Sequence, residues 1–162
     1  MKIGMMVHSE TGHTMDVAHA IETALKKEGY EVEIRSVVAK SKRPWKESMP
    51  SIKETPDPNG YDVLILGAPV WGFTLSRVME EYLFQVRPIE TKRLILFSTG
   101  ALPRFFGGKR AMKIMHDISK VPEAKTIYAG SVRFPRKKKP RFKREVVDAA
   151  VRAVKTLEQE KD

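Results

Sequence analysis

Three hydroxyl side chains near the N-terminus, Ser9, Thr11 and Thr14, have a spacing that suits anion binding. An apolar run precedes them and an amphipathic segment follows, which predicts a strand, a short loop and a helix start. The first N–H groups of a helix lack internal partners, and the helix dipole favours negative charge there. Gly12 lets the backbone approach a ligand closely. We predict a phosphate site in residues 9–14; the simpler alternative is an ordinary strand-to-helix turn capped by Thr14.

Ionisable side chains flank these hydroxyls. His8 and His13 could take part in proton transfer or simply line the loop, and lining is favoured because no partner acid stands at a motif spacing. Glu10 either faces a ligand or, beside a phosphate dianion, turns to solvent. The four histidines show no metal-ligand spacing among themselves, so no metal site is predicted.

Two further loops end apolar runs and carry residues suited to a ligand. They are Pro69-Val70-Trp71-Gly72 and Ser98-Thr99-Gly100. Trp71 could be a core residue that needs a partner for its indole N–H, or a cleft wall that offers a flat apolar face. Its position directly after a strand favours the wall. The loop that continues from the second of these runs adds Phe105 and Phe106.

Hydrophobic periodicity predicts alternating strands and helices. Continuous apolar runs indicate buried strands, and alternating runs indicate strands with one wet face or at an edge. Buried strands are expected at 2–7, 61–68 and 93–97, and half-buried strands at 30–38 and 126–134. Helices are expected at 14–28, 74–86, around 111–118 and at 146–157. The proline-rich segment 39–60 is predicted to be a loop with a turn or two around 46–53.

This burial pattern predicts an α/β fold: a three-layer, doubly wound, five-stranded parallel sheet with strand order 2-1-3-4-5. That order places the two half-buried strands at the edges and creates a switch point between the first and third strands. Ligands bind at the carboxyl ends of strands beside such a point, so the three loops are expected to converge there. No internal repeat is visible, and residues 1–162 are expected to form one domain.

Other anion sites that follow a first strand do not fit these residues. A dinucleotide fingerprint needs Gly-x-Gly-x-x-Gly, and only Gly12 is present. A nucleotide P-loop needs a lysine where His13 stands. A response-regulator receiver needs an Asp at the end of the third strand, which here ends Gly67-Ala68-Pro69. A low-molecular-weight tyrosine phosphatase needs a cysteine, and the chain has none.

Composition narrows the class of protein further. With 41% hydrophobic and 31% charged residues, the 162-residue chain suits a soluble α/β domain with a sizeable core. No apolar run is long enough to cross a membrane, and the first strand leaves no room for a signal peptide. The absence of cysteine fits a cytoplasmic protein. The formal net charge of +10 implies attraction to anions, whether phosphate, acidic proteins or nucleic acid.

Much of that positive charge lies in one run near the C-terminus. Residues 136–144 read Arg-Lys-Lys-Lys-Pro-Arg-Phe-Lys-Arg. The run could bind an acidic protein or nucleic acid, but a solvated loop is the favoured interpretation. Phe142 is the one aromatic residue in this run. Proteins that bind single-stranded nucleic acid stack successive bases on several aromatic side chains, so the run is a weak candidate for that function.

With the three loops in this order, the sequence resembles the flavodoxin family. Ser9-x-Thr11-Gly12-x-Thr14 matches the family's phosphate-binding signature for flavin mononucleotide (FMN). The run from Tyr61 to Gly72 resembles the second flavin loop, where a Trp often stacks on the isoalloxazine ring. Ser98 to Gly100 stands where the third flavin loop begins. The resemblance spans the whole chain and is to the short-chain type.

The resemblance implies a role for each loop. The hydroxyls of Ser9, Thr11 and Thr14, with backbone N–H groups from Glu10 to Thr14, would hold the phosphate of FMN. Trp71, with Pro69, Val70 and Gly72 around it, would stack on the ring, and Phe105 or Phe106 would replace the tyrosine common on its outer face. Backbone groups from Ser98 to Gly100 would bond the pyrimidine edge.

The charge of this sequence departs from the family's pattern. Flavodoxins that carry electrons are usually acidic, whereas this chain is strongly basic. We expect an FMN-binding flavodoxin-like redox protein that transfers electrons to a redox partner protein. That partner could have an acidic surface. The alternatives are an NAD(P)H-dependent quinone or flavin reductase, and a basic module of the same fold that docks an acidic partner or nucleic acid. The carrier is favoured over the enzyme because no separate nicotinamide motif is visible.

Overall fold

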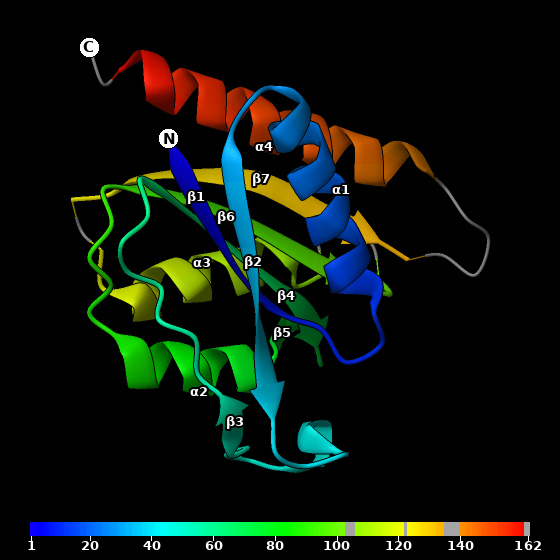
Figure 1. Cartoon of the computed structure of the whole chain (residues 1–162). Helices are drawn as coiled ribbons and strands as arrows, with labels where there is room; N and C mark the ends of the chain where they lie inside the picture. Colours follow the sequence, from blue (N-terminus) through cyan, green and yellow to red (C-terminus); the bar gives the residue numbers. More distant parts are fainter. Residues whose placement is uncertain (103–105, 122, 135–139, 161–162) are drawn as a thin grey trace.

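Five parallel strands form the centre of the sheet in the computed structural model, which describes residues 1–102, 106–121, 123–134 and 140–160. They are β1 (Lys2–His8), β2 (Glu31–Ala39), β4 (Val63–Trp71), β6 (Arg93–Gly100) and β7 (Lys125–Arg133). Their order across the sheet is β2-β1-β4-β6-β7, with every neighbouring pair parallel (Figure 1). The predicted fold class and the strand order 2-1-3-4-5 are therefore confirmed.

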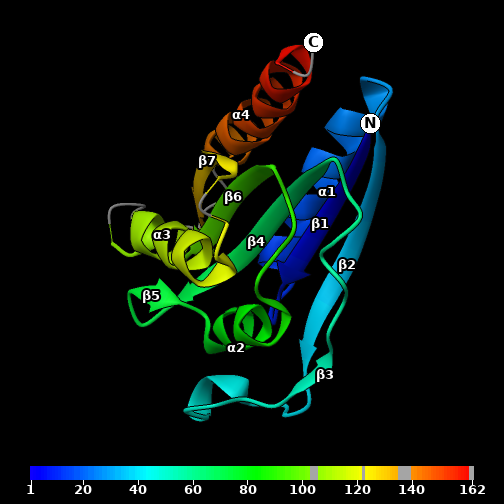
Figure 2. The ribbon, with the colours of Figure 1, turned by 90° about the vertical axis from the view of Figure 1, so that its left-hand side faces the viewer.

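Four helices cover the two faces of this sheet. They are α1 (His13–Lys27), α2 (Arg77–Val86), α3 (Gly108–Ser119) and α4 (Pro140–Gln159). Figures 1 and 2 show α1 and α4 on one face and α2 and α3 on the other. Each face has its own apolar core, one centred on Ile21 and Val154 and the other on Met79 and Met115. The strands β1, β4 and β6 lie between the two cores, which explains why their sequences are continuously apolar.

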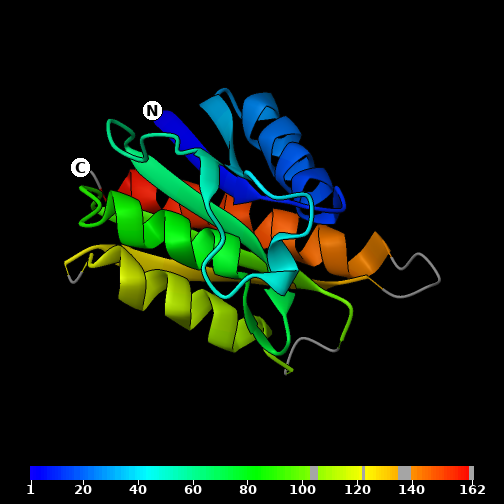
Figure 3. The same cartoon turned by 90° about the horizontal axis from the view of Figure 1, so that it is seen from below.

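The segment after β2 holds more structure than its prolines suggest. A 3₁₀ turn, η1 (Pro44–Lys46), is followed by the short strand β3 (Ile52–Glu54), which pairs antiparallel with the end of β2. Figure 3 shows this segment passing beneath α2, and the Tyr82 hydroxyl donates to the carbonyl of Pro56 at 2.7 Å. The segment therefore covers part of α2 and of the sheet edge.

The helix predicted from residue 74 was placed too early. Thr74 and Leu75 form the short strand β5 (Thr74–Leu75), which folds back antiparallel on β4, and α2 begins only at Arg77. The Ser76 side chain accepts from the Met79 backbone N–H and caps the helix. The sequence signal for a helix and the tight hairpin overlap here, because Leu75 packs in the same core as the apolar face of α2.

All β-to-α loops lie at one edge of the sheet, where the parallel strands end. Three of these connections are long enough to shape a site: the loop from His8 to His13, the hairpin from Trp71 to Thr74, and the segment that runs from Gly100 to Gly108. The predicted convergence of the three loops is therefore observed. Within the described part of the chain, no helix has both the length and the apolar character needed to cross a bilayer.

Close packing between β4 and β6 predicts the effect of one small substitution. Gly67 pairs with Phe97, and a Cβ atom at Gly67 would lie 2.1 Å from the Phe97 ring. Gly67→Ala should lower the free energy of unfolding by about 1–3 kcal/mol through overpacking, measured by urea denaturation. Phe97→Leu in the same background should recover part of that loss, since it removes the ring that causes the clash. Equal urea midpoints for wild type and Gly67→Ala would contradict this packing.

Candidate functional site

The loop between β1 and α1 has the geometry of an anion site. Gly12 is the N-cap of α1 with φ of 87°, and the Ser9 hydroxyl accepts from the Met15 N–H at 3.2 Å. The next helical N–H, that of Asp16, donates to the carbonyl of Gly12. Among the described residues, the N–H groups of His13 and Thr14 have no hydrogen-bond partner. Two free N–H groups at a helix start form the kind of concavity that binds a phosphate.

The hydroxyls of this loop divide into two kinds. Thr11 is exposed at the mouth of the loop. Thr14 is only 2% exposed, and its hydroxyl contacts that of Thr99 at 2.7 Å. These two hydroxyls contact each other and connect α1 to β6. Of the Thr11 and Thr14 hydroxyls, that of Thr11 is the one exposed to solvent in this structure.

His8 lies beneath this loop and connects it to α2. Its side chain is 1% exposed; Nδ1 lies 2.8 Å from Ser76 Oγ and Nε2 lies 3.0 Å from Glu10 Oε1. Ser76 already accepts from the Met79 N–H, so its own proton is available for His8 Nδ1. Nε2–H then donates to the Glu10 carboxylate. This tautomer completes one chain of hydrogen bonds from the N-cap of α2 to the anion loop.

Glu10 is therefore held by an imidazole rather than turned freely to solvent. Burial lowers the pKa of His8, and the hydrogen bond that His8 donates to the Glu10 carboxylate opposes that shift only in part. The imidazole is neutral at pH 7 and donates to Glu10 without carrying charge. Its ring also meets Trp71 edge-on, with ring centroids 5.2 Å apart. Trp71 is half-buried at the end of β4 and packs against the core on the α2 side.

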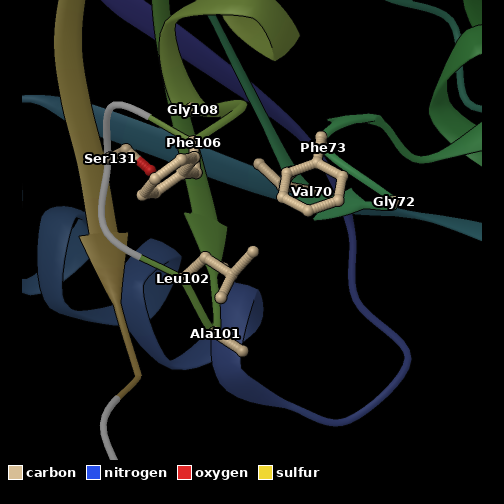
Figure 4. A pocket seen from close by; sticks show the side chains of 9 residues that line it. Val70, Gly72, Phe73, Ala101, Leu102, Phe106, Gly108 and Ser131 are labelled. Carbon is tan, nitrogen blue, oxygen red and sulfur yellow. The ribbon is translucent and has the colours of Figure 1, made fainter.

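A hollow lies between the β4–β5 hairpin and the start of α3 (Figure 4). Its lining residues are Val70, Gly72, Phe73, Gly100, Ala101, Leu102, Phe106, Gly108 and Ser131. Its volume is about 170 Å³, below the roughly 300–1,000 Å³ of a pocket that encloses a drug-sized ligand. The hollow therefore suits a planar ring that inserts one edge and leaves the other in solvent.

Two phenylalanines frame this hollow from opposite walls. The Phe73 and Phe106 side chains are 55% and 48% exposed, and their ring centroids lie 6.4 Å apart in an edge-on arrangement. Phe73 sits in the two-residue turn of the hairpin, where both Gly72 and Phe73 have positive φ. Such a turn matches the twist of the paired strands but costs a non-glycine residue conformational energy. The hairpin therefore presents Phe73 at its tip despite local strain.

Gly107 allows the start of α3 to pack closely against the hairpin that carries Phe73. It caps α3 with φ of 95°, and a Cβ atom there would lie 2.6 Å from the Phe73 carbonyl oxygen. The Ser98 hydroxyl supports the same helix start by donating to the Gly108 carbonyl at 3.3 Å. Only glycine fits this close approach of two backbones. The distance between the phenylalanine walls is thus set by backbone packing.

The anion loop and the hollow are neighbours along the same edge. His13 stacks on Phe134, with ring centroids 4.1 Å apart and an interplanar angle of 24°. The Phe134 N–H donates to the carbonyl of Gly100, which lines the hollow. A single Phe134 residue therefore joins the two subsites. One elongated ligand, anionic at one end and flat and apolar at the other, would span them.

The predicted site residues fall into four groups in the structure. Ser9, Glu10, Thr11, Gly12 and His13 form the anion loop, with Thr14 buried behind it. Val70, Gly72, Gly100 and Phe106 line the hollow. Pro69, Ser98 and Thr99 lie in paired strands beneath it, and Trp71 lies beside His8. Phe105 falls outside the described residues. The ligand contacts assigned to these residues remain predictions.

Several residues of this region had no such role in the sequence prediction. Phe73 and Leu102 line the hollow because of loop conformations that no local pattern announces. Ser131 comes from the edge strand β7. Its alternating sequence predicts a polar face, but it does not show that this face borders the hollow. Ser76 could have been found, since Ser before an amphipathic segment is a typical N-cap. Its hydrogen bond to His8, 68 residues away, could not.

The fold of this chain is similar to that of solved flavodoxins and flavoproteins. Flavodoxin 2 from Bacillus cereus superposes with a TM-score of 0.70 at 18% identity, covering 96% of this chain and 99% of that chain. The flavodoxin, WrbA-like protein from Agrobacterium tumefaciens gives 0.69 at 12%, covering 98% of each chain. A flavoprotein from Lactobacillus acidophilus, crystallised in complex with FMN, gives 0.61 at 19%, covering 82% of this chain and 92% of that chain. Neither a protein-family model nor a curated protein sequence matches the chain. At these identities the likeness shows the fold, and the chain has the flavodoxin-like fold expected from its sequence.

The buried imidazole predicts how stability depends on pH. His8 binds its proton less readily in the folded state than in the unfolded state, where its pKa is near 6.5. Its contribution is therefore complete above about pH 6.5 and is lost as the pH falls toward the lowered folded-state pKa, with a slope of at most about 1.4 kcal/mol per pH unit. Urea denaturation between pH 5 and 8 should show a steeper acid loss for wild type than for His8→Gln. A slope in His8→Gln that matches the wild-type slope would contradict the assignment.

Proposed function

We propose that this protein binds FMN and transfers electrons through it. The observation that carries the proposal is the adjacency of a helix-start anion site and an aromatic-walled hollow at the switch point of a flavodoxin-like sheet. Neither feature alone specifies a flavin, but phosphate and isoalloxazine are the two ends of FMN. The FMN complex of the Lactobacillus acidophilus flavoprotein supports the same ligand class for this fold.

The residues present fit the parts of FMN. The free N–H groups of His13 and Thr14 and the Thr11 hydroxyl would hold the phosphate. Phe73 and Phe106 would flank the ring, and the backbone at Gly100 would meet its pyrimidine edge, as the family resemblance implies. When bound, the isoalloxazine supplies the ability to accept and release electrons. The protein's part is to orient the ring, exclude water from one of its edges and leave the other open.

A reductase is the second candidate, and one observation favours it. A broad groove of about 1,000 Å³ lies between α3 and β7 and shares Ser131 with the hollow. Lys109 and Tyr128 line it, and Lys113 and Asp117, which also line it, form an ion pair with each other. Among the described residues, the groove therefore offers one unpaired cation, Lys109, and an aromatic face to a second substrate. A steady-state assay of the FMN-loaded protein with NADPH or NADH and a quinone separates the two candidates. Sustained turnover supports the reductase, and its absence supports the carrier.

The phosphate assignment predicts a selective loss in one variant. Thr11→Ala should weaken FMN binding about tenfold to hundredfold, because hydrogen bonds to a charged group contribute about 1.5–3 kcal/mol. Riboflavin has no phosphate, so its affinity should not change. Flavin fluorescence titration measures both. Thr55→Ala, at another exposed threonine, is the control. If riboflavin binds wild type as tightly as FMN does, the phosphate does not anchor the ligand.

The ring assignment predicts opposite effects on stability and on binding. Phe73→Gly should relieve the positive-φ strain and leave the fold equally stable or up to about 1 kcal/mol more stable. The same variant should weaken FMN binding about tenfold, because one stacking contact is lost. Trp71→Phe tests the contact implied by the family resemblance. If Trp71→Phe loses FMN affinity while Phe73→Gly keeps it, Trp71 is the ring contact.

A further inference from the structure

Three exposed cationic side chains lie next to, or two positions beyond, residues that line the hollow. Lys109 and Arg110 occupy the first turn of α3, directly after the lining residue Gly108, and both are exposed. Arg133 lies two residues beyond Ser131 on β7, so its side chain leaves the strand on the same face as this lining residue. In the sequence, no Asp or Glu stands within two positions of any lining residue. We call Lys109, Arg110 and Arg133 the basic rim.

The basic rim adjoins the hollow, whose lining includes an exposed apolar centre. Phe73, Leu102 and Phe106 are each about half exposed, and all three line the hollow. Of the acids near the adjacent anion loop, Asp16 is paired with Lys143, whereas Glu10 accepts from the neutral His8 imidazole and keeps its charge. An apolar centre with a charged rim is the usual anatomy of a protein–protein interface. Here the rim carries only positive charge.

The opposite edge of the sheet has a different pattern. The segments that precede β6 and β7 present Glu90, Lys92, Lys120 and Glu123 around one shallow hollow. Positive and negative charges alternate there, so their fields largely cancel at a distance. The basic rim has no such compensation. A negatively charged partner would therefore be steered toward the hollow rather than toward the far edge.

We propose that the basic rim and its apolar centre dock an acidic redox protein. The choice of surface rests on the charges and exposures given above; the choice of a redox protein rests on the proposed FMN function. Docking here would bring the partner against the open edge of the bound ring. Nucleic acid is the disfavoured polyanion, because the apolar centre is a compact patch of two phenylalanines and a leucine. A single strand needs a row of stacking platforms along a groove.

The test compares two variants that change net charge by the same amount. Lys109→Glu/Arg110→Glu reverses two charges of the basic rim, and Lys92→Glu/Lys120→Glu reverses two at the opposite edge. Isothermal titration at low salt measures binding of a plant-type [2Fe–2S] ferredoxin, which is acidic, and of horse cytochrome c, which is basic. Circular dichroism confirms that each variant folds. The titrations use the protein with and without FMN, so docking is measured independently of cofactor loading.

The expected results are specific to the basic rim. Ferredoxin should bind wild type, and binding should weaken as salt is added. The rim variant should lose at least tenfold in ferredoxin affinity, and the far-edge variant should change less than threefold. Cytochrome c should not bind wild type. Equal losses in the two variants would show a net-charge effect only and would overturn the proposal.

Two further outcomes separate this proposal from its alternatives. A fluorescein-labelled 20-nucleotide DNA strand that binds more tightly than ferredoxin, and is weakened by the rim variant, would assign the surface to nucleic acid and overturn the proposal. Ferredoxin binding without FMN binding would support the docking surface and refute the proposed cofactor. FMN binding without ferredoxin binding would do the reverse.

Discussion

The architecture of this site depends on strands that are buried on both faces. The apolar side chains of β1, β4 and β6 must be covered from two sides, and helices on both faces of a parallel sheet satisfy that requirement. Each helix returns the chain to the opposite edge before the next strand begins. All loops that follow strands are therefore forced to one edge. This topology brings three segments together at that edge: the anion loop, the hairpin that carries Phe73 and the start of α3.

Within that frame, buried polar groups fix the loops in position. The His8 imidazole is desolvated, and leaving either ring nitrogen without a partner would be costly. Ser76 and Glu10 supply both partners, which links the N-cap of α2 to the anion loop. The contact between Thr14 and Thr99 links α1 to β6 in the same way. These bonds connect the loop and its flanking elements to α2 and to β6, so its free N–H groups are preorganised for an anion.

The sequence predicted the fold and the convergence of the three loops, whereas the side chains that face a ligand remain predictions. Continuous and alternating apolar runs identify the five strands, because burial on two faces or one leaves a direct record in residue type. The anion loop was predicted from hydroxyls and a glycine at a helix start, a pattern that an ordinary helix N-cap shares. The pattern gives residue types, and it cannot say which hydroxyl turns inward.

The features that the sequence did not reveal have physical causes that operate at long range. Thr14 faces Thr99 because of a contact between residues 85 positions apart. Phe73 reaches the hollow because the turn of the hairpin forces it into a conformation that its residue type disfavours, and propensity predicts the opposite. The two-residue strand β5 is too short to leave a periodic signal, so its residues were assigned to the following helix. In each case a tertiary contact determines a conformation that the local sequence does not predict.

Under the proposed function, the strong positive charge of the chain could affect the reduction energy of the bound ring or the attraction of a partner protein. The distance over which each effect acts shows which of them is larger. A cation near the reduced ring would lower the cost of negative charge, but by only about 1 kcal/mol for a pair 4 Å apart in water, and salt screens it further. Lys109, Arg110 and Arg133 are exposed, so each contributes little to the ring alone. Attraction of a whole acidic surface sums over all three cations at once and acts before contact. The basic rim therefore affects which partner arrives, and how fast, more than it affects the energy of the bound electron.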